Sequence, residues 1–160
     1  MLRKTSISAA VSAIVMIAAS GTAQAQDWRL TPSYGSVSLS SGYTPDPYLV
    51  NLQSGGSIDA SRSIGGNCRG YVANAPDYRL QYRAGTVLPL IISVSSSADT
   101  TLVVNGPDGR WYCDDDGGQG LNPSLRWNTP MSGQYDIYVG TYGTASYRNA
   151  TLSISELNSY

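Results

Sequence analysis

Histidine and phenylalanine are absent from this sequence of 160 residues, and lysine and glutamate occur once each, as Lys4 and Glu156. Without histidine, and with no lysine beyond residue 4, the chain cannot build a Ser-His-Asp triad or a Ser-Lys dyad. A zinc site is excluded as well, because two cysteines alone do not supply enough ligands. We therefore predict that the protein is not an enzyme. The remaining enzymatic hypothesis is glycoside hydrolysis by two aspartates, but no two of them stand in visibly different environments.

Long apolar stretches and concentrated basic charge are also missing, apart from one N-terminal segment. Residues 1–25 have a positively charged start, an apolar stretch over 7–19 and small residues before Ala25, which predicts a Sec-type signal peptide cleaved after Ala25. We expect a periplasmic or secreted protein with no membrane anchor, because no later segment has 18 consecutive apolar residues. Residues 26–160 carry a formal charge of −3, which argues against a nucleic-acid partner.

Cysteine is scarce, and its two copies are predicted to pair. An exported protein meets oxidising conditions, so Cys68 and Cys113 are interpreted as one disulfide. The bond closes a loop of about 45 residues, which corresponds to roughly 4 kcal/mol of stabilisation on the chain-entropy estimate. The two cysteines therefore have a structural role.

Short alternating segments separated by Gly and Pro turns dominate residues 26–160. Tyr78, Leu80 and Tyr82, for example, alternate with polar residues, as in a strand that has one buried face. No stretch has helical periodicity. About nine short strands at spacings near ten residues predict a single all-β domain, an antiparallel β-sandwich or jelly roll. The expected strands include 57–60, 78–83, 87–94, 100–104, 110–113, 124–128, 134–142 and 151–155, with Pro89 at a bulge or a sheet edge.

The densest group of functional residue types is the acidic run Asp114, Asp115 and Asp116, which stands directly after Cys113 and before Gly117. Three adjacent carboxylates repel one another unless a cation, an arginine or water compensates them. Carboxylate and carbonyl oxygens are the ligands that calcium prefers, so the run predicts a Ca2+ loop.

Further ligands and a competing interpretation follow from the neighbouring loops. Asp99 and Asp108 flank the preceding hairpin and would join the calcium site if the loops share an end of the sheet. The run is not an EF-hand, because Leu125 occupies the position of the bidentate glutamate. Alternatively, the run is a solvated acidic turn paired with Arg110 or Arg126.

Twelve tyrosines and three tryptophans supply the aromatic surface. Such rings stack on sugars or hold peptides, so the candidate ligand-binding aromatics are Trp111, Tyr112, Tyr138 and Tyr142. These side chains would serve a glycan, a cell-envelope component or a protein partner. In the structural alternative, strand tyrosines cover the edges of the sandwich while Trp111 and Trp127 fill its core.

The order of several motifs resembles a known family. The segment from Ala98 to Val104 is followed by Gly106-Pro107-Asp108-Gly109, by Cys113 with the acidic run, and by the strand 133–139. This order resembles the bacterial pre-peptidase C-terminal domain over about residues 70–157. The resemblance implies a calcium-associated jelly-roll module, usually appended to secreted proteases. We expect a stand-alone module with no protease attached, and a serine-peptidase label carried by relatives would conflict with the missing histidine.

Overall fold

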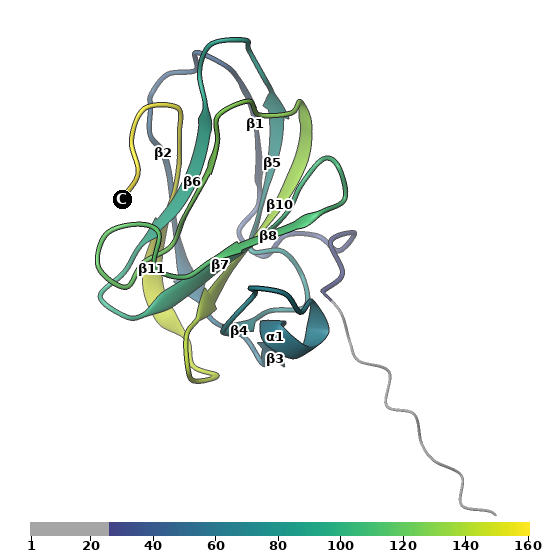
Figure 1. Ribbon diagram of the computed structural model, residues 1–160, viewed down its shortest axis with the longest axis vertical. Coiled ribbons are helices and arrows are strands. Elements are labelled where there is room, and N and C mark those ends of the chain that lie inside the picture. The colour runs from purple at the N-terminus through teal and green to yellow at the C-terminus, as the bar shows by residue number, and fades with distance from the viewer. Residues whose placement is uncertain (1–25) are drawn as a thin grey trace, which may run out of the picture.

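The computed structural model describes residues 26–160, and the predicted signal peptide, residues 1–25, lies outside the described residues. In the described part, eleven strands form two sheets that pack face to face, together with a single-turn helix (Figure 1). Cys68 and Cys113 form a disulfide. The predicted all-β sandwich with one disulfide is therefore confirmed.

Sheet A is organised around its longest strand, β10 (Gly133–Thr141), which pairs antiparallel with β5 (Tyr78–Arg83) on one side and with β7 (Thr100–Asn105) on the other. At the two edges, β1 (Ser36–Ser40) pairs with β5 in parallel, and β8 (Trp111–Asp114) pairs with β7 as a hairpin. The short strands β4 (Tyr71–Val72) and β3 (Ile58–Asp59) continue the sheet from the end of β10.

Sheet B contains four antiparallel strands. Its order is β2 (Tyr48–Ser54), β11 (Arg148–Ser155), β6 (Leu90–Ser95) and β9 (Ser124–Trp127). Because β6 is central, its residues from Leu90 to Val94 are all buried. The strand predicted to start at Val87 begins only at Leu90, because Pro89 has no N–H to donate to a neighbouring strand. Val87 lies outside the sheet and is 86% exposed.

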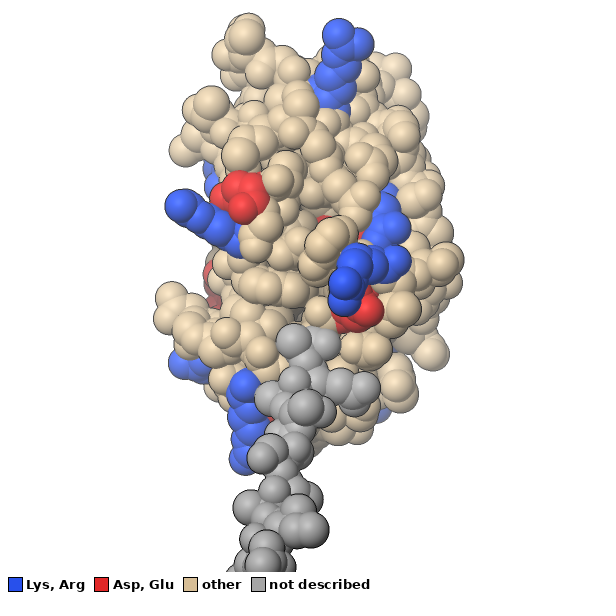
Figure 2. All heavy atoms as spheres, turned by 90° about the vertical axis from the view of Figure 1, so that its right-hand side faces the viewer, with Lys and Arg blue, Asp and Glu red and all other residues tan. Residues whose placement is uncertain are grey.

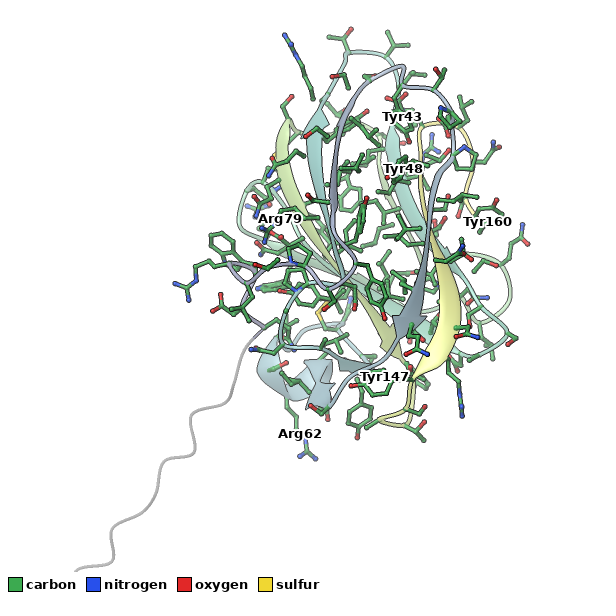
Figure 3. All side chains as sticks on the ribbon, turned by 180° about the vertical axis from the view of Figure 1, so that it is seen from behind. Tyr43, Tyr48, Arg62, Arg79, Tyr147 and Tyr160 are labelled. Atoms are coloured by element: carbon green, nitrogen blue, oxygen red, sulfur yellow. A yellow bond between two sulfur atoms is a disulfide. The ribbon has the colours of Figure 1, made fainter. Side chains whose placement is uncertain are left out.

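The main core lies between the two sheets. Alternation along the strands directs Leu80 and Tyr82 of β5 and Ile137 of β10 inward, where they pack against Leu152 and other buried side chains of sheet B. Tyr43 and Tyr48 pack against the same core from one end of the sandwich (Figure 3). The large cluster of branched aliphatic and tyrosine side chains is what holds the two layers together.

A second, smaller core covers the outer face of sheet A. Val103 of β7 and Tyr138 of β10 point outward and are completely buried beneath a segment that contains α1 (Ala60–Ser63) and Cys68. The expectation of no helix is wrong at this one turn: the carboxylate of Asp59 accepts hydrogen bonds from Ser61 N and Oγ, which caps the turn. The strand predicted over 57–60 therefore shrinks to β3.

The surface is sparsely charged. Figure 2 shows the side of the molecule that lies on the right in Figure 1, where a few acidic and basic side chains, some of them side by side, lie in a largely uncharged surface. No helix in residues 26–160 is long and apolar enough to cross a membrane.

Candidate functional site

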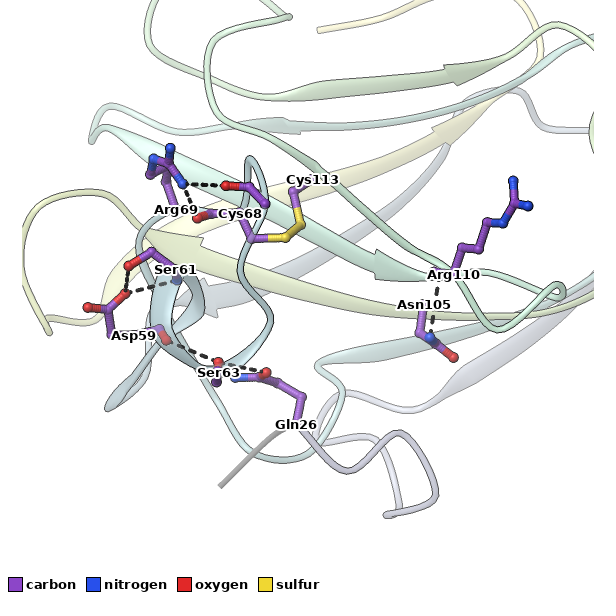
Figure 4. Close-up of a disulfide and its surroundings, with 10 residues drawn as sticks. Gln26, Asp59, Ser61, Ser63, Cys68, Arg69, Asn105, Arg110 and Cys113 are labelled. Carbon is purple, nitrogen blue, oxygen red and sulfur yellow. Dashed lines mark hydrogen bonds between the residues drawn. A yellow bond between two sulfur atoms is a disulfide. The ribbon is translucent and has the colours of Figure 1, made fainter. Parts of the chain in front are cut away.

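The acidic loop begins where β8 ends and runs to the start of β9. The Cys68–Cys113 disulfide holds the last residues of β8 against the segment that carries α1, with 5.0 Å between the two Cα atoms (Figure 4). Arg69 supports this junction by donating to the backbone oxygens of Cys68 and Gly66, at 2.8 and 3.0 Å. The loop therefore leaves the sheet from a covalently fixed position.

The side chain of Asp114 is used to close the loop. Its Oδ2 atom accepts hydrogen bonds from Gly117 N at 2.7 Å and from Ser124 N at 2.8 Å. A Cβ atom at position 117 would come within 2.6 Å of the same oxygen, which explains the glycine there. Asp114 is thus an internal cap that joins the start of the loop to the first residue of β9.

The negative charges of Asp115 and Asp116 act on Asp99. The pKa of Asp99 lies above its ordinary value, first because of burial and then because of the negative charges of Asp116 and Asp115. The Oδ1 atom of Asp99 is buried and has no hydrogen-bond partner among the described residues. The three carboxylates therefore concentrate negative charge at the end of the sheet where β7 begins.

Neither arginine of the alternative interpretation compensates this charge in the structure. Arg110 contacts Asp108, with 3.6 Å between Nε and Oδ2, and Arg126 donates from Nε to Asn128 Oδ1 at 2.8 Å. The ion pairs found between residues 26 and 160 do not include the acidic run. No group of three or more potential ligands among these residues is arranged closely enough to hold a metal ion.

Asp108 lies at the other end of the hairpin from the acidic loop. It belongs to the turn that follows β7, whereas Asp99 precedes β7, so the six residues of that strand, about 20 Å, separate them. Burial acts to raise the pKa of Asp108, but hydrogen bonds from Tyr112 Oη and Arg110 N outweigh it and leave the pKa below its ordinary value. The structure does not bring Asp108 together with the other predicted ligands.

The four candidate aromatic residues do not share one surface. Tyr138 is completely buried in the smaller core, where its ring centre lies 5.7 Å from that of Trp111. Tyr112 packs on the opposite side of β8, with its ring 5.3 Å from that of Trp127. Tyr142 is 44% exposed but follows the end of β10 that is remote from Trp111.

A different group of residues, on the outer face of sheet A, has no counterpart in the sequence predictions. The guanidinium of Arg79 on β5 pairs with the carboxylate of Asp136 on β10, with 2.5 Å between Nε and Oδ1. The Arg79 guanidinium also donates to the backbone oxygens of Trp28 and Leu30. Strand alternation marks Arg79 and Asp136 as outward-facing, but nothing local indicates that residues 26–35 cross over them.

Comparison with known proteins adds little. No model of a known protein family matches the chain, and no curated protein matches it. Among solved structures, it has a likeness to PliG from Aeromonas hydrophila, described as a periplasmic lysozyme inhibitor of g-type lysozyme, with 12% identity and a TM-score of 0.37. The match covers 76% of this chain and 96% of the other. A likeness this low supports no conclusion about this chain.

Proposed function

We propose that this chain is an exported, non-catalytic β-sandwich module, related to the pre-peptidase C-terminal domain, with a structural or binding role and a calcium ion at its acidic loop. Export is supported by the signal-like segment 1–25 and by the disulfide, a bond typical of proteins outside the cytosol. The product is a periplasmic or secreted protein cleaved after Ala25. Its partner is a glycan, a cell-envelope component or a protein.

The observation that carries the calcium proposal is the environment of Asp99. A buried carboxylate oxygen without a hydrogen-bond partner is costly, and the neighbouring charges of Asp115 and Asp116 increase that cost. A calcium ion would relieve both penalties, with the remaining positions filled by backbone oxygens and water. We propose Asp99, Asp115 and Asp116 as its carboxylate ligands, which the ion would have to draw together because they are too far apart in the structure to hold it. Asp108 has no part in this set because of its position, and Asp114 contributes indirectly by closing the loop.

The calcium proposal is tested by following thermal unfolding of chelator-treated protein during a calcium titration. At a concentration 100 times the dissociation constant, binding stabilises the fold by about 2.7 kcal/mol, which raises Tm by roughly 8 °C for a domain of this size. Asp99→Asn and the double variant Asp115→Asn/Asp116→Asn are expected to abolish the rise. Asp108→Asn is the matched control and retains it.

A constant midpoint up to millimolar calcium in the unmodified protein removes calcium from the proposal. An unchanged rise in Asp99→Asn would place the ion elsewhere. Magnesium in place of calcium serves as a second control, because Mg2+ keeps its waters more tightly and prefers a smaller octahedral site.

The absence of catalysis is proposed from the chemistry of the side chains. No histidine occurs, and the only lysine lies in the predicted signal peptide. The three buried acids of the described residues, Asp77, Asp136 and Glu156, accept hydrogen bonds from backbone N–H groups or from the side chains of Arg79, Gln134 and Tyr82, as structural carboxylates do. Hydrolysis of a peptide or glycan panel by the purified protein would contradict this part, including any serine-peptidase or paired-aspartate activity.

A further inference from the structure

A hollow of about 330 Å³ lies on the outer face of sheet A, between the β7–β8 turn and the N-terminal segment. Trp28 and Pro107 are among the residues that line it. Its polar lining comes from Asn105 at the end of β7 and from Gln134 and Asp136 on β10. Figure 2 faces this side of the molecule. The volume is at the lower end of the range for small-molecule sites.

The Trp28 wall is held firmly although it belongs to no strand. Arg79 donates from Nη2 to the Leu30 oxygen at 3.1 Å and also to the Trp28 oxygen, while its Nε atom pairs with Asp136 in the floor of the hollow. Figure 3 shows Arg79 beside this segment. Asp27 N adds a hydrogen bond to Asn74 O at 2.9 Å. The backbone of Trp28 is thus fixed to the floor, while the residue itself stays 44% exposed.

The polar groups of the hollow retain unused hydrogen-bonding capacity. Asp136 accepts one hydrogen bond on each carboxylate oxygen, from Arg79 Nε and from Gln134 Nε2, and it is 1% exposed, so it supports the floor of the hollow from below. Gln134 keeps its second N–H as a donor. Asn105 uses its nitrogen in two long hydrogen bonds, of 3.4 and 3.5 Å, and keeps its amide oxygen as an acceptor.

The charge of the hollow favours an uncharged ligand. The carboxylate of Asp136, 2% exposed, is already compensated by the guanidinium of Arg79, so neither an anion nor a cation gains a free counter-charge there. The planar amide of Gln134, which keeps one N–H as a spare donor, suits a hydroxyl group of a neutral ligand. An aromatic wall suits the apolar C–H face of a sugar ring, because the ring buries apolar area while its hydroxyl groups reach the polar floor.

We propose that this hollow is a binding site for a neutral or N-acetylated hexopyranose unit of a glycan, with Trp28 as the stacking residue and Gln134 as the hydroxyl partner, above a floor made by the buried Asn105 and Asp136. This inference deepens the binding role proposed above by giving it a site and a ligand class. It uses neither the acidic loop nor the aromatic set Trp111, Tyr112, Tyr138 and Tyr142.

The test is an array of neutral and N-acetylated oligosaccharides, followed by calorimetric titration of the tightest binder into the purified protein. Trp28→Ala is expected to weaken binding at least about tenfold, because Trp28 is the only aromatic residue among the described residues that line the hollow. Trp28→Phe retains part of the affinity. Tyr147→Ala is the matched control: Tyr147 is 64% exposed and lies at a distant end of the molecule (Figure 3), so its removal leaves binding unchanged.

Two results overturn the site. One is the absence of binding to every neutral or N-acetylated oligosaccharide at millimolar concentration, including the case in which only charged glycans or peptides bind. The other is equal affinity in Trp28→Ala and in the unmodified protein, provided that both have the same thermal midpoint. The glycan titration is repeated in calcium and in chelator to separate this proposal from the calcium proposal. Glycan binding that persists in chelator supports the glycan site even if calcium does not change the thermal midpoint.

Discussion

Replacing Asp77 with Asn is expected to stabilise the fold at neutral pH and to remove a pH dependence from its stability. Asp77 is 3% exposed, and its Oδ2 atom accepts a hydrogen bond from Val139 N at 2.7 Å. Burial raises the pKa of this carboxyl from 3.8 to about 7, although the Val139 hydrogen bond acts in the opposite direction. The folded protein therefore retains a proton on Asp77 at pH values where the unfolded chain has lost it.

The sign and the size of the effect follow from this difference in pKa. Between about pH 4 and pH 7 the folded state binds more protons than the unfolded state, so stability falls as pH rises through this window and levels off above it. A shift of about three pKa units corresponds to a loss on the order of 4 kcal/mol. An Asn side chain stays neutral, and its amide oxygen accepts the same hydrogen bond from Val139, so the variant avoids this loss.

Urea unfolding of the unmodified protein and Asp77→Asn, at intervals across this pH window and above it, measures the difference directly. We expect the two unfolding free energies to be similar near pH 4 and to diverge up to pH 7, with the variant the more stable. Asp99 has a raised pKa too, so the difference between the two proteins is the informative quantity. Parallel curves, or a variant that is less stable above pH 7, would show that Asp77 is not buried as a neutral acid.

Two further predictions concern bonds that hold the loops. The double variant Cys68→Ser/Cys113→Ser is expected to lose about 4 kcal/mol of stability in urea unfolding, since the disulfide closes a 45-residue separation. Reductant added to the unmodified protein is expected to cause a similar loss. An unchanged unfolding free energy in both experiments would contradict this prediction. Tyr82→Phe removes the 2.5 Å hydrogen bond to the buried carboxylate of Glu156 and is expected to lower the free energy of unfolding by about 1.5–3 kcal/mol. Tyr43→Phe removes a hydrogen bond to the neutral backbone oxygen of Ile154 and is expected to lower it by about 1 kcal/mol. Equal thermal midpoints of the two variants would contradict this ranking.

Much of the fold follows from local patterns. Alternation in Tyr78–Arg83 predicts both the strand and the side of it that faces the core, because successive side chains of a strand point in opposite directions. The Asn105–Gly109 turn similarly predicts the β7–β8 hairpin. The single-turn helix α1 escaped prediction, since four residues are too few to display helical periodicity, and the Asp59 cap and the packing of Ala60 help to hold it.

The candidate sites were less accessible to prediction than the strands. The acidic run identified the loop, but whether Asp99 or Asp108 lies near it depended on the end of β7 to which each is attached. Asp77 follows Pro76 in a segment typical of an exposed turn. The N-terminal segment and β10 bury it, and both are distant in the sequence.

By itself, the sequence determined the all-β class, the disulfide partners and the absence of histidine and lysine chemistry from residues 26–160, because these depend on composition and on a two-residue period. Only the tertiary structure decided that Asp114 closes its own loop, that Tyr138 is buried, and that Trp28 stands beside Asp136. These arrangements depend on contacts between segments far apart in the chain, such as Arg79 with residues 28 and 30, and a local sequence pattern contains no information about such contacts.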